Sequence, residues 1–218
     1  RCNREYFEKI MGYNKLKGVK VIFFTMAGKK HTLQFKRLSE FTEDKDEYIK
    51  LTASWAKTAW GYLHLDDKKY YLREVKEKQN EIYVATFYGL PVAMFGLFER
   101  RLDPFRDEDD NTLAPSNTEL KAVYFDYVFV EEKVRGLGFA RQLLDKAKAL
   151  AIELGADLIY LETLNPKLNN MYKKLDAKVI CEGQYIENPT DVLSINIKKP
   201  DAQVVCEALE FERRPRMY

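Results

Sequence analysis

Residues 135–141 read Arg-Gly-Leu-Gly-Phe-Ala-Arg and separate two strongly patterned segments of the 218-residue chain. The segment before them, 120–130, is rich in β-branched and aromatic residues, which favours a strand. The segment after them, 138–154, has apolar residues at the 3.6-residue period of an amphipathic helix. Small residues at such a junction let a ligand approach the backbone, and the first N–H groups of the helix favour a phosphate. An ordinary strand–helix turn is the alternative, because isolated glycine motifs are weakly specific.

Two familiar phosphate motifs fit this chain badly. A P-loop needs a glycine five positions before its Gly-Lys pair and Ser or Thr after it. Around Gly28 the chain has Phe23 and Lys30 at those positions, so the motif fails. The dinucleotide fingerprint GxGxxG/A needs a third small residue, and Arg141 occupies that position.

Outward from the junction, the residue patterns predict an α+β chain folded around one twisted sheet. Antiparallel hairpins come first, then a β-α-β-α segment, then a closing hairpin. Ser39 is the expected N-cap of a long helix that is interrupted at Gly61, and Gly155 is expected to end the helix after the junction. The predicted strands are 31–38, 81–87, 91–98, 120–130, 157–164, 178–184 and 192–198. The predicted helices are 39–60, 66–78, 138–154 and 166–175, and a loop is predicted over 100–118.

The junction resembles the cofactor motif of the GNAT acetyltransferases. Arg135, Gly138 and Ala140 match the family pattern (Q/R)xxGx(G/A). As in that family, the motif follows a β-rich strand after four residues and opens a long amphipathic helix.

A second segment is similar to the family's N-x-x-A-x-x-x-Y-x-x-x-G-F pattern. Asn165 and Tyr172 have its seven-residue spacing and open and close a predicted short helix. The chain departs from the pattern at Leu168, where Ala is usual, and at Asp176 and Ala177, which replace Gly-Phe. Because Asp tolerates a left-handed backbone better than most residues, the turn can persist.

The resemblance implies the GNAT acyl-CoA N-acyltransferase fold. This fold has three layers, with a central twisted mixed sheet of about seven strands between helices. The expected organisation is an N-terminal extension over 1–31, a GNAT domain over 32–199 and a charged tail over 200–218. Within the extension, the patterns predict a helix over 1–18 and an extra strand over 19–26.

The resemblance also implies acetyl-CoA, or another acyl-CoA, as co-substrate and no metal. The backbone of Val128, Phe129 and Val130 would pair with the pantetheine arm like an added strand. The N–H groups of the junction would bind the pyrophosphate. Asn165 would contact the cofactor or simply cap its helix. The junction residues are Arg135, Gly136, Leu137, Gly138, Phe139, Ala140 and Arg141.

The resemblance implies direct transfer from the thioester to an amine in a ternary complex. Tyr172 would protonate the leaving thiolate, with a core aromatic as the alternative. Asp126, the one carboxylate inside the strongest predicted strand, is the expected base, with an ion-pair partner as the alternative. Tyr124, Glu99 and a water chain are the other candidates for the base.

The acceptor side is less defined by the sequence. Residues 99–110 carry six acidic and three basic side chains, which would favour a cationic amine if this loop borders the acceptor, as it does in the family. Trp55 and Trp60 would line the acceptor pocket or belong to the core. A small amine, an aminoglycoside, a peptide N-terminus and a protein lysine all stay open as acceptors. A homodimer also stays open.

Composition narrows the class of protein. The chain has 36 basic and 34 acidic residues, so its charge gives no reason to expect nucleic-acid binding. Three widely spaced Cys and two His make a disulfide scaffold or zinc site unexpected and favour a reducing, cytoplasmic location. The longest apolar runs are too short to cross a bilayer.

The sequence therefore predicts an acetyl-CoA-dependent N-acetyltransferase. One alternative is a catalytically inactive CoA-binding regulatory or interaction module of the same fold. A nucleotide-binding or dinucleotide-binding protein is the other.

Overall fold

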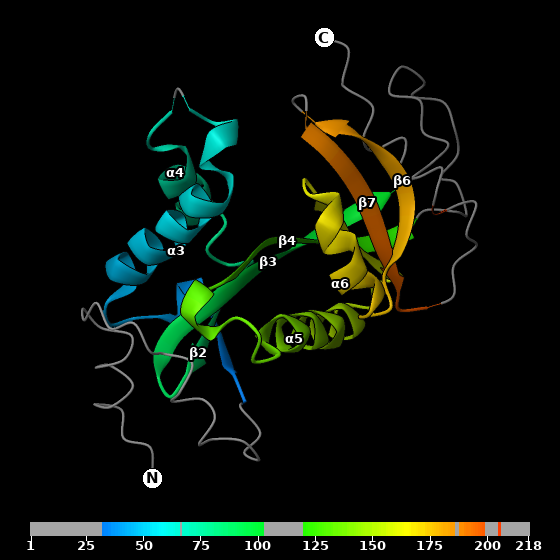
Figure 1. Ribbon diagram of the computed structural model, residues 1–218. Helices are drawn as coiled ribbons and strands as arrows, with labels where there is room; N and C mark the ends of the chain where they lie inside the picture. Colours follow the sequence, from blue (N-terminus) through cyan, green and yellow to red (C-terminus); the bar gives the residue numbers. More distant parts are fainter. Residues whose placement is uncertain (1–31, 66, 103–119, 186–187, 199–204, 206–218) are drawn as a thin grey trace, which may run out of the picture. The chain divides into compact units, whose positions relative to one another are not determined.

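The computed structural model describes residues 32–65, 67–102, 120–185, 188–198 and 205 (Figure 1). The helix predicted over 1–18, the strand over 19–26, most of the loop over 100–118 and nearly all of the tail lie outside the described residues.

The strands form one mixed sheet in the order β1-β2-β3-β4-β5-β7-β6. β4 and β5 are parallel, whereas β1 pairs antiparallel with β2, and β7 pairs antiparallel with β5 and β6. The strands are β1 (Gln34–Arg37), β2 (Ile82–Phe87), β3 (Leu90–Leu102), β4 (Leu120–Val130), β5 (Leu158–Thr163), β6 (Lys178–Tyr185) and β7 (Asn188–Asn196). The α-helices of the described residues are α3 (Lys45–Trp60), α4 (Tyr70–Glu77), α5 (Phe139–Glu153) and α6 (Asn169–Lys173). The predicted α+β fold, with seven strands in a mixed sheet flanked by helices, is confirmed.

The structure confirms the predicted hairpin between β2 and β3, the end of α5 at Gly155 and the bounds of β4. The β2–β3 connection turns at Tyr88 and Gly89, both of which have positive φ, at 52° and 79°. Gly155 follows α5 with a φ of 71°, as expected for a residue that ends a helix. β4 has the predicted bounds.

Other boundaries were wrong, and tertiary contacts explain them. Ser39 does not cap a long helix: its N–H donates to the Gln79 carbonyl over 3.0 Å, and α3 begins only after Asp44. β3 runs on to Leu102, inside the predicted loop, because Leu102 is buried in the core. In α4, Tyr71 and Val75 are buried, whereas Tyr70 and Leu72 are only partly buried.

The chain divides into two compact units. One comprises the residues up to Phe95 together with Tyr127–Leu143, and the other comprises Gly96–Asp126 and the residues from Leu144 onward. The two long strands β3 and β4 and the helix α5 pass through both units. The first unit contains α3 and α4, which lie side by side (Figure 1), and the Tyr71 hydroxyl donates to the Trp60 carbonyl over 2.7 Å.

The second unit contains α6, most of α5 and the strands β5, β6 and β7. Its core includes a cluster on β3, β4, β5 and β7 that also takes in Val205, which is 1% exposed. A residue of the expected charged tail therefore packs in this core. The other members are Leu102, Leu120, Ala122, Leu158, Tyr160 and Val192.

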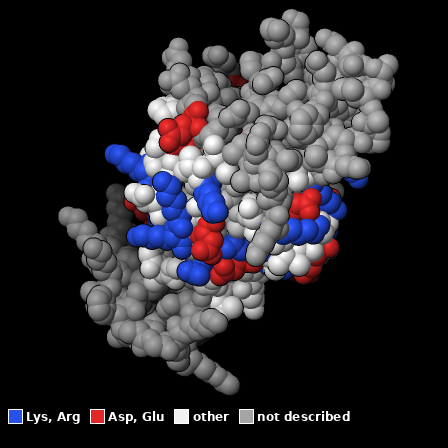
Figure 2. All heavy atoms as spheres, turned by 90° about the vertical axis from the view of Figure 1, so that its right-hand side faces the viewer, with Lys and Arg blue, Asp and Glu red and all other residues white. Residues whose placement is uncertain are grey.

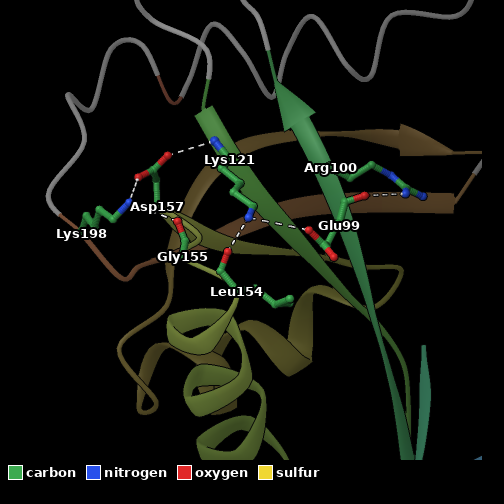
Figure 3. Close-up of polar contacts among 7 residues, drawn as sticks. All are labelled: Glu99, Arg100, Lys121, Leu154, Gly155, Asp157 and Lys198. Carbon is green, nitrogen blue, oxygen red and sulfur yellow. Dashed lines mark hydrogen bonds and ion pairs between the residues drawn. The ribbon is translucent and has the colours of Figure 1, made fainter. Parts of the chain in front are cut away.

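A polar cluster fastens the C-terminal end of α5 to the neighbouring strands (Figure 3). Lys121 Nζ donates to the Leu154 carbonyl, and Lys198 Nζ donates to the Gly155 carbonyl over 3.1 Å. Asp157 accepts from the Lys121 N–H over 2.9 Å and from Lys198 Nζ over 2.8 Å. Two ammonium groups thus lie where the helix dipole is negative, which stabilises this end.

The charges of this unit are mixed rather than separated. On the face drawn in Figure 2, basic and acidic side chains of the described residues are interspersed. Lys121 also lies 3.8 Å from Glu99, and Lys148 lies 3.6 Å from Asp176. Among the described residues of this unit, opposite charges thus lie close together in pairs.

Replacing Asp157 should make the fold less stable at neutral pH. Burial alone would raise the pKa of this carboxyl, but the bonds from Lys198 and Lys121 outweigh it and hold the pKa below its ordinary value of 3.8. The stabilisation is thus present above the unfolded pKa and is lost as pH falls through the lower folded pKa. We expect Asp157→Asn to cost about 1–2 kcal/mol at pH 7 and less at pH 3, measured by denaturant unfolding.

Asp67→Asn is the matched control. Asp67 also has a lowered pKa and pairs with Arg73, but both side chains are exposed, and such pairs contribute little. An equal loss at pH 7 and pH 3 for Asp157→Asn would contradict the assigned cause.

Candidate active site

The strand β4 contains a strained residue next to its candidate base. Tyr127 has a φ of 53°, a left-handed value that costs an aromatic residue about 1–3 kcal/mol. The ladder between β4 and β5 covers 122–124 and 158–160, although β4 itself continues to Val130. The backbone therefore departs from regular extended geometry at Tyr127, directly after Asp126.

Contacts within the first unit hold Tyr127 in this conformation. Its side chain is 6% exposed, and its hydroxyl lies 3.4 Å from a Glu74 carboxylate oxygen. Its ring packs edge-on against Trp60 at 5.9 Å, and Lys78 Nζ lies 5.6 Å from the ring centroid. A strained residue fixed from several sides is typical of a functional site.

The end of β4 is anchored by Trp55 on α3. The indole Nε1 donates to Glu131 Oε1 over 2.6 Å, and the ring stacks on Phe129 at 5.4 Å. The Glu131 N–H donates to the Val92 carbonyl over 2.9 Å. Trp55 is 4% exposed, so it is a core residue that positions the strand end.

Arg135 holds the junction loop against this strand end. Its Nε donates to the Val130 carbonyl over 3.0 Å, and its guanidinium lies 6.0 Å from the Phe129 ring centroid. Its own N–H donates to the Glu132 carbonyl over 3.2 Å. The Arg135 N–H thus already has an acceptor within the loop, and the phosphate contacts expected of the junction residues stay a prediction.

The two glycines of the junction have the geometry that an anion site requires. Gly136 and Gly138 have φ values of 85° and 80°, and a Cβ built on either would meet no atom within 4 Å. Gly138 directly precedes α5, whose first N–H groups have no intrahelical acceptors. The loop therefore combines open space at two backbone positions with the positive end of a helix dipole.

The first side chains of α5 contact neighbouring elements and thereby anchor the start of the helix. Phe139 is 1% exposed and packs edge-on against Phe87 at 5.2 Å. Gln142 accepts from the Leu33 N–H over 2.9 Å. The helix start is thereby fixed to the sheet, and the ligand-binding atoms expected here are backbone N–H groups.

In the second unit, α6 carries Tyr172. The side chain is 7% exposed. Burial raises the pKa of the Tyr172 phenol well above its ordinary value, and the charge of Asp126 raises it further. The phenol therefore stays protonated at neutral pH, as a proton donor must, and the unit brings Tyr172 within electrostatic reach of Asp126.

Asp126 is half-buried on β4, on the same side of the strand as Tyr124. The two other named candidates for the base are less suited. Burial raises the pKa of the Tyr124 phenol, with further contributions from Asp126 and Glu162. Glu99 is exposed and lies 3.8 Å from Lys121.

The sequence was compared with models of known protein families. The model of the acetyltransferase (GNAT) family matches residues 42–177, well over half of the chain. The chain belongs to the GNAT acetyltransferase family. A comparison with curated protein sequences gave no significant match.

Solved structures show the same GNAT fold at low sequence identity. An aminoglycoside 6'-N-acetyltransferase complexed with coenzyme A is 13% identical, with a TM-score of 0.55 over 77% of this chain and 99% of that one. Ard1 from Thermoplasma volcanium is 15% identical, with a TM-score of 0.53 over 77% and 99%. A chain of the NatC complex bound to Gag peptide and CoA is 17% identical, with a TM-score of 0.50 over 75% and 98%.

The second GNAT segment has the predicted local geometry. The Asn165 side chain accepts from the Lys167 N–H over 3.1 Å, with Pro166 at the first position of the turn. Asn165 therefore caps this turn, and its contact with a cofactor stays a prediction. Asp176 replaces the family glycine and adopts a φ of 70°, so the turn persists as expected.

Besides the conformation of Tyr127, two features of this GNAT chain were not foreseen. The contact between Trp55 and Glu131 joins residues 76 positions apart, and no local pattern indicates it. Asn169 was also missed, although it lies three positions before Tyr172 and so shares its helix face. Asn169 and Tyr172 are both buried. Their three-residue spacing, read as one face of the predicted short helix, could have pointed to Asn169.

Over the described ranges, no group of three or more His, Cys, Asp and Glu side chains could hold a metal ion. No helix of that part of the chain is long and apolar enough to span a bilayer.

Proposed function

We propose that this GNAT protein transfers an acetyl group from acetyl-CoA to an amine by direct attack in a ternary complex. The observation that carries the proposal is the junction between β4 and α5, where two glycines with positive φ open the backbone at a helix start. Coenzyme A has a pyrophosphate that suits such a helix start. The related fold in an aminoglycoside acetyltransferase complexed with coenzyme A supports the same cofactor class.

The proposed cofactor contacts divide into two sets. The N–H groups from Gly136 to Arg141 bind the pyrophosphate. The backbone of Val128–Val130, at the end of β4, pairs with the pantetheine amides. Asn165 is a further proposed contact, through the side-chain atoms that its cap leaves available.

The proposed reaction needs two proton transfers, which are assigned to Asp126 and Tyr172. An alkylammonium acceptor must lose a proton before it attacks, since its pKa is about 10.4. Asp126 accepts that proton, directly or through water. The amine nitrogen then bonds to the thioester carbonyl carbon, the C–S bond breaks, and the Tyr172 hydroxyl protonates the departing thiolate. The second proton of the nitrogen is released as the amide forms and returns, directly or through water, to the Tyr172 oxygen.

The acceptor is proposed as an amine-bearing small molecule, peptide or protein lysine. Relatives of this fold include enzymes for aminoglycosides and a complex bound to Gag peptide, so the fold accommodates small-molecule and peptide acceptors.

Turnover of acetyl-CoA against a panel of amines, measured as release of the CoA thiol, tests the function. Stabilisation by CoA with no thiol release on any amine would instead favour an inactive CoA-binding module. Stabilisation by NAD or ATP but not by CoA would contradict the cofactor assignment.

Replacing Tyr172 with Phe should lower kcat by about 10–100-fold. A thiol has a pKa near 8.5, so its thiolate leaves tolerably well without protonation, and the effect lies at the low end for a general acid. The KM for acetyl-CoA should change little, because the ring that fills the core is retained. Steady-state thiol release measures both constants.

Tyr62→Phe is the control, because that side chain is 50% exposed. The loss in Tyr172→Phe should shrink with a thioester whose thiol is more acidic. A kcat equal to wild type with every thioester would remove Tyr172 as the acid.

A further inference from the structure

A buried chain of polar side chains links α6 to two strands of the second unit. The Thr163 hydroxyl on β5 donates to Asn169 Oδ1 over 2.7 Å, and Asn169 Nδ2 donates to Asp191 Oδ2 on β7. Thr163, Asn169 and Asp191 are 3%, 8% and 7% exposed. Buried polar groups are costly unless paired, so each of these bonds stabilises its partners in one arrangement.

The sheet register aligns the two ends of this chain. Thr163 and Asp191 are direct partners in the β5–β7 ladder. Asn169 accepts with one end of its amide and donates with the other. The amide orientation is therefore fixed, and with it the rotation of α6 against the strands.

Asn169 shares a helix face with Tyr172. The two residues are three positions apart on a helix of only five residues, and both are buried. So short a helix has little stability of its own, and its placement depends on tertiary contacts.

The other end of α6 is also held. The Tyr172 carbonyl accepts from the Leu175 N–H over 2.8 Å and from the Ala177 N–H over 3.1 Å, across the turn at Asp176. The polar chain supplies the matching anchor at the N-terminal end, on the face that presents the phenol.

We propose that Asn169, held by Thr163 and Asp191, is a positioning residue for the Tyr172 hydroxyl. This inference rests on the proposed function, in which that hydroxyl protonates the thiolate. Acid catalysis depends on hydrogen-bond geometry at the reacting atom. A small rotation of α6 therefore lowers kcat strongly and changes the affinity for the cofactor only slightly.

An exchange of the amide and the carboxylate tests the proposal. Asn169→Asp leaves an acceptor for Thr163 but sets a carboxylate against Asp191, and the repulsion displaces the helix. The double variant Asn169→Asp with Asp191→Asn keeps the bond from Thr163 and restores the bond between positions 169 and 191 with its donor and acceptor reversed. We expect Asn169→Asp to lower kcat about tenfold with little change in the KM for acetyl-CoA, and the double variant to return kcat to within about threefold of wild type.

The same change is then made in the Tyr172→Phe background. If Asn169 acts through the phenol, Asn169→Asp costs no further activity there, because the two effects are not additive. An equal tenfold loss in both backgrounds would overturn the proposal. Thr163→Val, which removes only one bond, gives a milder loss and covers the case in which Asn169→Asp does not fold.

A second readout is independent of turnover. The ring carbon bonded to the Tyr172 hydroxyl, labelled with carbon-13 and assigned with Tyr172→Phe, should shift in Asn169→Asp and return in the double variant. If the wild type is active but Asn169→Asp changes neither the ring signal nor kcat, the positioning role is contradicted and the proposed function is not. A wild type inactive on every amine contradicts the proposed function, and the ring signal still decides whether Asn169 orients Tyr172.

Discussion

Replacing Gly138 with Asp is expected to abolish CoA binding, with an affinity loss of at least about 100-fold. The introduced carboxylate would lie at the start of α5, where it accepts from N–H groups meant for the pyrophosphate and repels the phosphate charge. The position also has a φ of 80°, which strains any residue with a Cβ. Isothermal titration with CoA measures the loss.

Gly89→Asp separates the two causes. Gly89 has nearly the same φ, 79°, and equally open surroundings, but it lies in the β2–β3 turn. This variant has the same added charge and backbone strain and should bind CoA like wild type. Undiminished affinity in Gly138→Asp, or the same loss in both variants, would refute the assignment of the junction as the phosphate site.

Replacing Asp126 with Asn should lower kcat/KM by about 10²–10³-fold, the typical contribution of a positioned base. A base works only when deprotonated, so wild-type activity rises with pH through its pKa, and the variant should lose this acidic limb. An acceptor amine of low pKa is needed, since its own titration then falls outside the measured range. CoA affinity should be unchanged.

Glu99→Gln is the control for this variant. Glu99 is exposed and lies 3.8 Å from Lys121, so its replacement should leave the pH–rate profile as it is. An acidic limb that survives in Asp126→Asn would exclude Asp126 as the base and favour a water chain.

The parts of the site set by local sequence could be predicted. The bounds of β4 match, and α5 begins one residue later than expected, because residue type and period determine such elements directly. The left-handed turn at Asp176 also follows from a local preference.

The features that depend on distant contacts could not be predicted. Tyr127 is a strong strand former, and nothing in its neighbours indicates a φ of 53°. Its conformation is enforced by Trp60, Glu74 and Lys78, which belong to helices far away in the sequence. The bond between Asn169 and Asp191 likewise exists only once β7 has paired with β5.

The two ends of α5 differ in their surroundings. At the C-terminal end, Lys121 and Lys198 already satisfy the carbonyls of Leu154 and Gly155. At the N-terminal end, the helix start faces open space around Gly138. A bound pyrophosphate would therefore act as a cap for this helix. Its stabilising effect should be concentrated in the first turn, so that cofactor binding and local folding of the helix start become one coupled equilibrium.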